Sequence, residues 1–221
     1  MRTRFHEGLN QLKDKLLSMG GMAEAAVEQA ICAYRERAPE LCQKVIANEA
    51  LIDIAEREID SLALDPLAMQ QPMARDLRLI LAIIKSNADL ERIGDQAVNM
   101  ARRVIGLIQL PPAELPTDIP RMAGIVCEML RQSLEAFVTG DAALAQRVIE
   151  RDEHVDRLNQ EVFELVERTM ETSPELTRQA LHTLIITRNL GRIADHATNI
   201  AEDAIFWIRG TGVRRHLGAV V

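Results

Sequence analysis

The chain is poor in aromatic residues, with one Trp, one Tyr and four Phe among its 221 residues. A hydrophobic core must therefore consist mainly of Leu, Ile, Val, Ala and Met, which suit packing between helices better than packing on a sheet. This composition disfavours an all-β fold. The chain also lacks aromatic platforms for base stacking and carries a formal net charge of −7, so nucleic acid is not expected as a partner.

Glycine and proline are also scarce. The 11 Gly and 8 Pro fall below the usual combined share of about 12%, which predicts few turns and long helices. Breaks between helices are expected at six places: Gly20-Gly21, Ala38-Pro39, Ser61 to Pro72, Gly106 to Pro120, Thr139 to Asp141, and Ser173-Pro174. Ser173 followed by Pro174 is typical of a helix start, with Ser as the N-cap and Pro at the first helical position. Gln71-Pro72 predicts a second start of this kind.

Cysteine and long hydrophobic runs are sparse as well. The three cysteines show no metal-binding or disulfide spacing, which indicates reduced thiols buried as small hydrophobic residues. The longest apolar run, Leu79 to Ile84, is far shorter than the roughly 20 residues of a membrane span. No apolar stretch follows the basic N-terminus, so no secretory signal is expected. The sequence predicts a soluble, cytoplasmic protein, peripheral to membranes only through its partners.

The chain contains an internal repeat. A shift of 103 positions aligns Gln43–Ile46 with Gln146–Ile149, and a shift of 100 aligns Leu90–Ala101 with Leu190–Ala201. Each half shows apolar residues at helical spacing. We therefore predict an all-α fold of two tandem, pseudo-symmetric three-helix bundles. The expected division is a first repeat over residues 1–109, a Pro-rich linker over 110–120 and a second repeat over 121–221.

Acidic residues recur four positions apart within this repeat. The pairs are Glu49 with Asp53, Glu91 with Asp95, and Asp152 with Asp156. Four positions are about one helical turn, so each pair projects from one face of its helix. Such a pair is usually part of a solvated surface. Because the pairs recur in register across the two halves, a metal role stands beside the solvated surface as an open alternative.

The fourth pair is incomplete. Asp195 has Gly191 where its partner is expected, and Glu202, seven residues further along, returns to the same helical face as a possible replacement. Asn99 and Asn199 extend the acidic stripes by one turn. His196 points about 100° away from Asp195 and is expected to be a packed histidine. Carboxylate and amide oxygens suit a hard cation, iron or manganese. The candidate ligands are Glu49, Asp53, Glu91, Asp95, Asn99, Asp152, Asp156, Asp195, Asn199 and Glu202.

Three segments resemble signature stretches of the PhoU family of phosphate-transport regulators: Gln71–Arg78, Leu90–Asp95 and Arg192–Glu202. The resemblance covers nearly the whole chain. It implies two symmetric three-helix bundles, frequent dimers and multinuclear metal clusters, with iron, manganese, zinc and magnesium as candidate ions. By position, the first cluster would use Glu49, Asp53, Glu91, Asp95 and Asn99. The second would use Asp152, Asp156, Asp195 and Asn199, and Gly191 departs from its acidic pattern.

The function implied by the resemblance is regulatory and not enzymatic. The chain would be an adaptor between the ATPase subunit of a phosphate ABC importer and a phosphate-sensing histidine kinase, and would repress the starvation response when phosphate is plentiful. Two alternatives remain open. One is a metal-dependent hydrolase that uses the same carboxylates as ligands, although no recurring general base accompanies them. The other is a metal-free helical adaptor whose acidic stripes bind a basic partner surface.

Overall fold

The computed structural model describes residues 2–69, 72–113, 115 and 118–210, and the regular structure in these ranges is entirely helical. Six long α-helices and one short 3-10 turn follow in chain order: α1 (Arg2–Glu36), α2 (Pro39–Met69), α3 (Ala74–Ile108), α4 (Ile119–Thr139), α5 (Ala142–Thr172), η1 (Pro174–Leu176) and α6 (Thr177–Arg209). None of the described helices is apolar over a stretch long enough to span a membrane.

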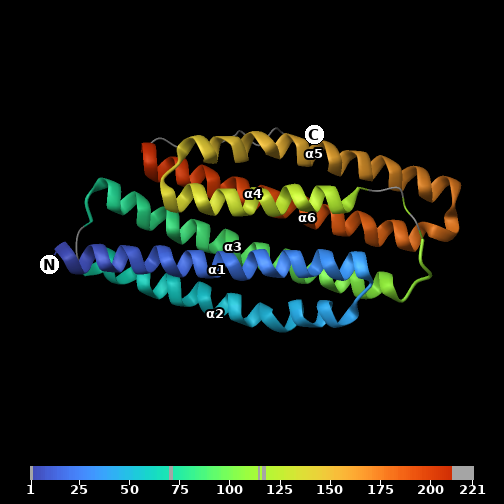
Figure 1. The fold of residues 1–221 in the computed structure, drawn as a ribbon, viewed down its shortest axis with the longest axis horizontal. Helices are drawn as coiled ribbons and strands as arrows, with labels where there is room; N and C mark the ends of the chain where they lie inside the picture. The colour runs from blue at the N-terminus through green and yellow to red at the C-terminus, as the bar shows by residue number, and fades with distance from the viewer. Residues whose placement is uncertain (1, 70–71, 114, 116–117, 211–221) are drawn as a thin grey trace.

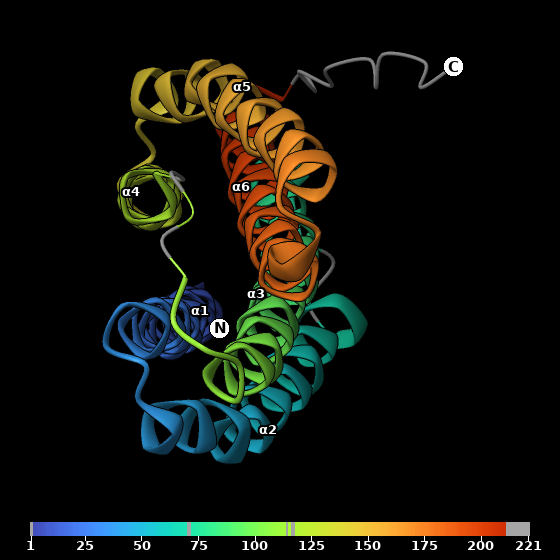
Figure 2. The same cartoon turned by 90° about the vertical axis from the view of Figure 1, so that its right-hand side faces the viewer.

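The helices form two three-helix bundles that lie side by side (Figure 1). Helices α1 to α3 form one bundle and α4 to α6 the other, which confirms the predicted fold class. Figure 2 shows that α3 packs along α6 and α1 packs along α4, while α2 and α5 lie on opposite outer sides. The contact between α3 and α6 is the most extensive between any two described helices. The centre of the molecule is therefore the α3–α6 crossing.

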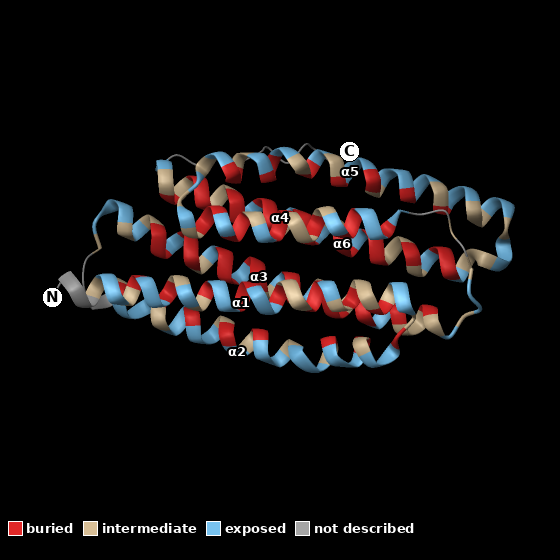
Figure 3. Cartoon of the chain, viewed as in Figure 1, coloured by how far each residue is buried: buried red, intermediate tan, exposed pale blue. Residues whose placement is uncertain are grey.

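One aliphatic core runs through both bundles (Figure 3). Leu12, Leu16 and Ile83 from the first half and Leu130 and Ile193 from the second are almost inaccessible to solvent. The side chains of α2 and α5 that face away from the core are exposed. The core thus consists mainly of Leu, Ile, Val, Ala and Met, as the scarcity of aromatic residues predicted.

The glycine pair at positions 20 and 21 does not break a helix, contrary to expectation, because both residues lie inside α1. Gly20 instead allows a close approach between the two halves. A Cβ at this position would lie 2.5 Å from Leu134 Cδ1 on α4. Packing against the second bundle therefore outweighs the cost of glycine in a helix interior, which is about 1 kcal/mol relative to Ala.

Of the other expected breaks, some lie further along the chain than predicted and others are confirmed. Helix α2 continues past Ser61 and through the buried Pro66 to Met69, and α3 continues past Gly106 to Ile108. The start predicted at Gln71-Pro72 lies partly outside the described residues, and α3 begins at Ala74. The break at Ser173-Pro174 is confirmed, since α5 ends at Thr172, but Ser173 precedes a 3-10 turn and makes no side-chain capping bond. The breaks at Ala38-Pro39 and at Thr139 to Asp141 are confirmed, the second with Gly140 in the left-handed region at φ 72°.

Arg37 joins the turn between α1 and α2 to the end of α3. Its Nη2 donates to the carbonyl oxygens of Leu107, Ile108 and Leu110 at 3.2, 3.0 and 2.7 Å. The last carbonyls of a helix have no partner within the helix. A cation at this end also interacts favourably with the negative end of the helix dipole. Arg37 therefore caps α3 where the chain leaves the first bundle. Helix α4 begins at Ile119, inside the range 110–120 expected to be a linker.

Candidate functional site

The acidic residues of the first half approach one another between α2 and α3. Burial raises the pKa of Glu91 above its usual range, and the negative charges of Asp95, Glu56 and Asp53 raise it further. Two predicted pairs are thus represented in one acidic cluster, by Asp53 from α2 and by Glu91 with Asp95 from α3. Glu56 was not among the predicted ligands, although its position three residues after Asp53 places it on the same side of the helix.

Two predicted ligands of this half have cationic neighbours. Glu49 Oε2 lies 3.8 Å from Arg102 Nη2 on α3, and Asp53 Oδ2 lies 4.0 Å from Arg57 Nη2 one turn along α2. The guanidinium groups neutralise part of the negative charge of the stripe. Asn99, one turn after Asp95 on α3, lines a pocket together with Arg103 of α3 and residues of α6.

The second half brings fewer acids together. Burial raises the pKa of Asp195, and the charge of Asp156 on α5 adds to this shift. At Gly191 an added Cβ would lie 3.5 Å from Asn159 Nδ2. The shift of 103 positions places Asn159 at the position of Glu56. The second half therefore lacks two carboxylates of the first cluster, while its remaining candidate, Asp152, is buried on α5.

Asn199 and Glu202 belong to a different group, at the crossing of α3 and α6. Asn199 Nδ2 donates to Asp89 Oδ1 at 3.1 Å. Burial raises the pKa of Asp203 to about 6, with Asp89 and Glu202 adding to the shift and the Lys85 ammonium opposing it. Asp89 was not among the predicted ligands, because its counterpart in the second half is Asn189, so no acid recurs there.

Across the ranges that the structure describes, no three Asp, Glu, His or Cys side chains are arranged so that they could hold one metal ion. The residue types of the first cluster suit a hard cation, but the side chains as placed do not form a metal site. The ten candidate ligands and the predicted metal ions therefore stay predictions.

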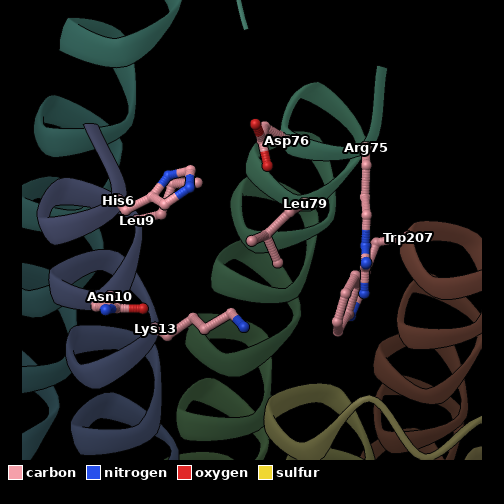
Figure 4. A pocket seen from close by; sticks show the side chains of 8 residues that line it. All are labelled: His6, Leu9, Asn10, Lys13, Arg75, Asp76, Leu79 and Trp207. Carbon is pink, nitrogen blue, oxygen red and sulfur yellow. The ribbon is translucent and has the colours of Figure 1, made fainter. Parts of the chain in front are cut away.

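A pocket of about 290 Å³ lies where α1, α3 and α6 meet (Figure 4). Lys13 Nζ lies 5.1 Å from the centre of the Trp207 ring, and the Arg75 guanidinium lies 5.7 Å from it. Burial lowers the pKa of Lys13, and the charge of Arg75 lowers it further. Both cations lie within the range of favourable cation–π contacts, and Asp76 also lines the pocket. The two cations that line the pocket thus lie against its aromatic ring, Trp207.

Comparison with known proteins gives a consistent picture over nearly the full chain. The PhoU domain matches residues 16–104 and 119–204, once in each bundle. A phosphate-specific transport system accessory protein PhoU homolog of Pseudomonas putida is 40% identical, over 97% of this chain and 84% of its own length. A homolog of the same description from Aquifex aeolicus is 37% identical, over 93% of each chain.

Two solved structures share the fold. PhoU from Pseudomonas aeruginosa matches with a TM-score of 0.90 and 38% identity, over 94% of this chain and 100% of that one. The phosphate transport system regulatory protein PhoU from Streptococcus pneumoniae matches with a TM-score of 0.85 and 25% identity, over 96% and 100%. From the two domain matches and the relatives above 30% identity, the chain belongs to the PhoU family.

Proposed function

We propose that this chain regulates phosphate uptake and the phosphate-starvation response as a cytoplasmic, homodimeric adaptor. It binds the ATPase subunit of a phosphate ABC importer and a phosphate-sensing histidine kinase, and it represses signalling when phosphate is plentiful. The observation that carries this proposal is the match of nearly the whole chain, in both bundles, to proteins described as accessory or regulatory components of phosphate-specific transport.

An adaptor needs a surface for its partners, and the outer side of α2 offers one. Leu51 and Ile54, one turn apart, are 54% and 50% exposed, and Leu64 further along the helix is also exposed. Exposed hydrophobic side chains that lie together mark contact sites more often than a scattered one does. The equivalent positions of α5, at 154, 157 and 167, hold His, Arg and Glu. The two outer helices therefore differ in character although they are related by the repeat.

The adaptor role can be tested in a strain that lacks the chain. We expect loss of the chain to leave the starvation response active in phosphate-rich medium and the wild-type chain to repress it again. The double variant Leu51→Asp/Ile54→Asp should fold but lose capture of the purified ATPase subunit or of the kinase. Phe163→Ser, at an exposed position of α5, is the matched control. Repression by a chain that binds neither partner would contradict the adaptor proposal.

Metal ions enter the proposal only as a second component. The support is the recurrence of the acidic pairs and the mutual approach of Asp53, Glu91 and Asp95, whereas the placement of the side chains does not itself form a site. Regulation through partner contacts does not depend on a bound ion. Absence of turnover on phosphoesters, with and without added metal, is the result expected of a regulator and not of a hydrolase.

A further inference from the structure

An open pocket of about 300 Å³ lies at one end of the α3–α6 crossing. Its lining combines three arginines, two asparagines and one aliphatic residue: Asn99, Arg103, Ile185, Arg188, Asn189 and Arg192. Asn99 and Arg103 are one turn apart on α3, and the other four share one face of α6. Two helices from different halves of the chain therefore aim cationic and amide groups into the same space.

The positive charge of this pocket is poorly neutralised. None of Arg103, Arg188 and Arg192 forms a salt bridge with any carboxylate that the structure describes. The charge of Arg192 reaches Asp195 one turn away and lowers the pKa of its carboxyl group, against the larger effect of burial. A concentration of three arginines around one hollow is unusual in a chain with a net charge of −7.

His182, a neighbour of the pocket, is also affected by positive charge. Burial lowers the pKa of His182, and the charges of Arg103 and Arg178 lower it further. His182 lies against Gly106, where an added Cβ would be 2.5 Å from its Cε1. The positive region therefore extends along α3 and α6 beyond the lining of the pocket.

The repeat supplies an internal comparison. The shift of 100 positions maps the pocket onto the opposite end of the crossing, where the corresponding residues are Asn199, Asp203, Lys85, Ala88, Asp89 and Arg92. At that end Lys85 Nζ binds Asp203 Oδ1 at 3.1 Å, and Asn199 Nδ2 donates to Asp89 Oδ1 at 3.1 Å. Two acids there balance two cations.

The open pocket differs from its counterpart at the positions that decide its charge. Arg103 stands where the other end has Asp203, Asn189 where it has Asp89, and Arg188 where it has Ala88. One end of the crossing thus neutralises itself, while the other keeps three positive charges and no acid in its lining. The packing of α3 on α6 does not itself require this charge, since the related end packs without it.

We propose that this pocket binds a small anion that carries a phosphoryl group. Guanidinium groups match the geometry of phosphoryl oxygens and donate paired hydrogen bonds to them. The side-chain amide of Asn99 offers further N–H donors beside the arginines, whereas Asn189 Nδ2 already donates to the carbonyl oxygen of Ile185 at 2.7 Å. A volume of about 300 Å³ lies at the lower end of the range for small-molecule sites, so the ligand is a single phosphoryl group with or without a small attached moiety.

The test is calorimetric titration of the purified full-length chain in low-salt buffer, with inorganic phosphate in one arm and AMP in the other. We expect saturable binding of at least one of them, against a background of chloride at matched ionic strength. Arg188→Ala, which copies the residue of the opposite end, should weaken binding at least about tenfold, the usual scale for losing a hydrogen bond to a charged group. Arg103→Gln should have a similar effect.

Arg102→Ala is the matched control, because Arg102 lies on the same helix but pairs with Glu49 outside the pocket. Binding of phosphate assigns the site to the free ion, and binding of AMP alone assigns it to a phosphoryl group on a larger molecule. Absence of binding in both arms, or equal losses in Arg102→Ala and Arg188→Ala with unchanged helical content, would overturn the inference. No partner protein enters this experiment, so its failure leaves the adaptor proposal standing.

Discussion

His196 Nδ1 on α6 lies 2.7 Å from Asp89 Oδ1 on α3, and this pair joins the second bundle to the first. The same carboxylate oxygen accepts a bond from Asn199. Asp89 is largely buried, and both of its partners come from the other half of the chain. His196 is therefore a packed histidine of the interface, as expected from its angle to Asp195.

Replacement of this carboxylate should loosen the interface. Asp89→Ala leaves His196 and Asn199 without their acceptor in a half-buried position, and we expect the free energy of unfolding to fall by about 1–3 kcal/mol. Urea denaturation followed by circular dichroism measures the change. Asp14→Ala, at an exposed position of α1, should shift it by less than about 0.5 kcal/mol. Equal stability of the two variants would show that the pair contributes nothing.

Asp203 should give stability a pH dependence opposite in sign to that of most carboxylates. Burial raises its pKa from 3.8 to about 6, so the folded state holds this proton more tightly than the unfolded state does. Stability from this group is present below about pH 4 and is lost as the pH rises towards about 6. Asp203→Asn should remove this loss of stability. Losing the ion pair with Lys85 should cost little, because the Lys85 side chain is 51% exposed to solvent.

The measurement is the free energy of unfolding of wild type and Asp203→Asn across that pH window. The variant should gain on the wild type by up to about 3 kcal/mol, the equivalent of the shift in pKa. Parallel profiles for the two proteins would mean that the carboxyl group of Asp203 titrates normally in the folded state.

Cation uptake should distinguish the two acidic clusters. The first half contributes Asp53, Glu56, Glu91 and Asp95, whereas Gly191 and Asn159 leave the second with Asp156 and Asp195. After removal of metal with a chelator and incubation with Mn²⁺, elemental analysis should find metal in the wild type. Asp95→Asn should lose it, because the first cluster supplies more oxygen ligands.

Asp195→Asn is the matched variant for this experiment and should retain the metal. Equal retention in both variants would place the ion elsewhere, and no uptake by the wild type would leave the acidic stripes to partner binding or packing. The Gly191→Glu variant adds a carboxylate opposite Asn159, and uptake by the second half should then rise.

Cys127 should be a poor nucleophile although part of it is accessible. Burial raises the pKa of its thiol to about 12, with the charges of Glu28 and Glu24 adding to the effect. The reactive thiolate is then about a thousandfold rarer than for an ordinary thiol at mildly alkaline pH. Alkylation by iodoacetamide, followed by mass spectrometry, should be slow in the folded chain and fast in urea. Similar rates in both states would contradict the raised pKa.

The architecture could be predicted from sequence because a repeat constrains two halves at once. Helical spacing and the shifts of 103 and 100 positions indicated two three-helix bundles, and acid pairs one turn apart correctly placed Glu91 beside Asp95. Helix breaks were less predictable. Gly20 and Pro66 are local signals, and packing against Leu134 or burial in the core outweighed them.

The side chains of the α3–α6 crossing could not be placed from sequence. Asn99 and Asn199 follow the acidic stripes at helical spacing, but each meets the opposite half: Asn99 lines a pocket with Arg188 of α6, and Asn199 donates to Asp89 of α3. Which face of a helix meets the second bundle depends on the docking of the halves. Spacing within one helix carries no information about that docking.

The cap that Arg37 places on α3 has a consequence for the way in which the halves associate. Arg37 holds the C-terminal end of α3 in place, and the connection to the second bundle runs from there, from Ile108 to Ile119. Two bundles tied by so short a connection meet at an effective concentration of about millimolar or above. Their interface can therefore be weaker than one between separate subunits, and it tolerates buried polar residues such as Asp89 and Asn189. Covalent tethering thus leaves the two ends of the crossing free to diverge in charge.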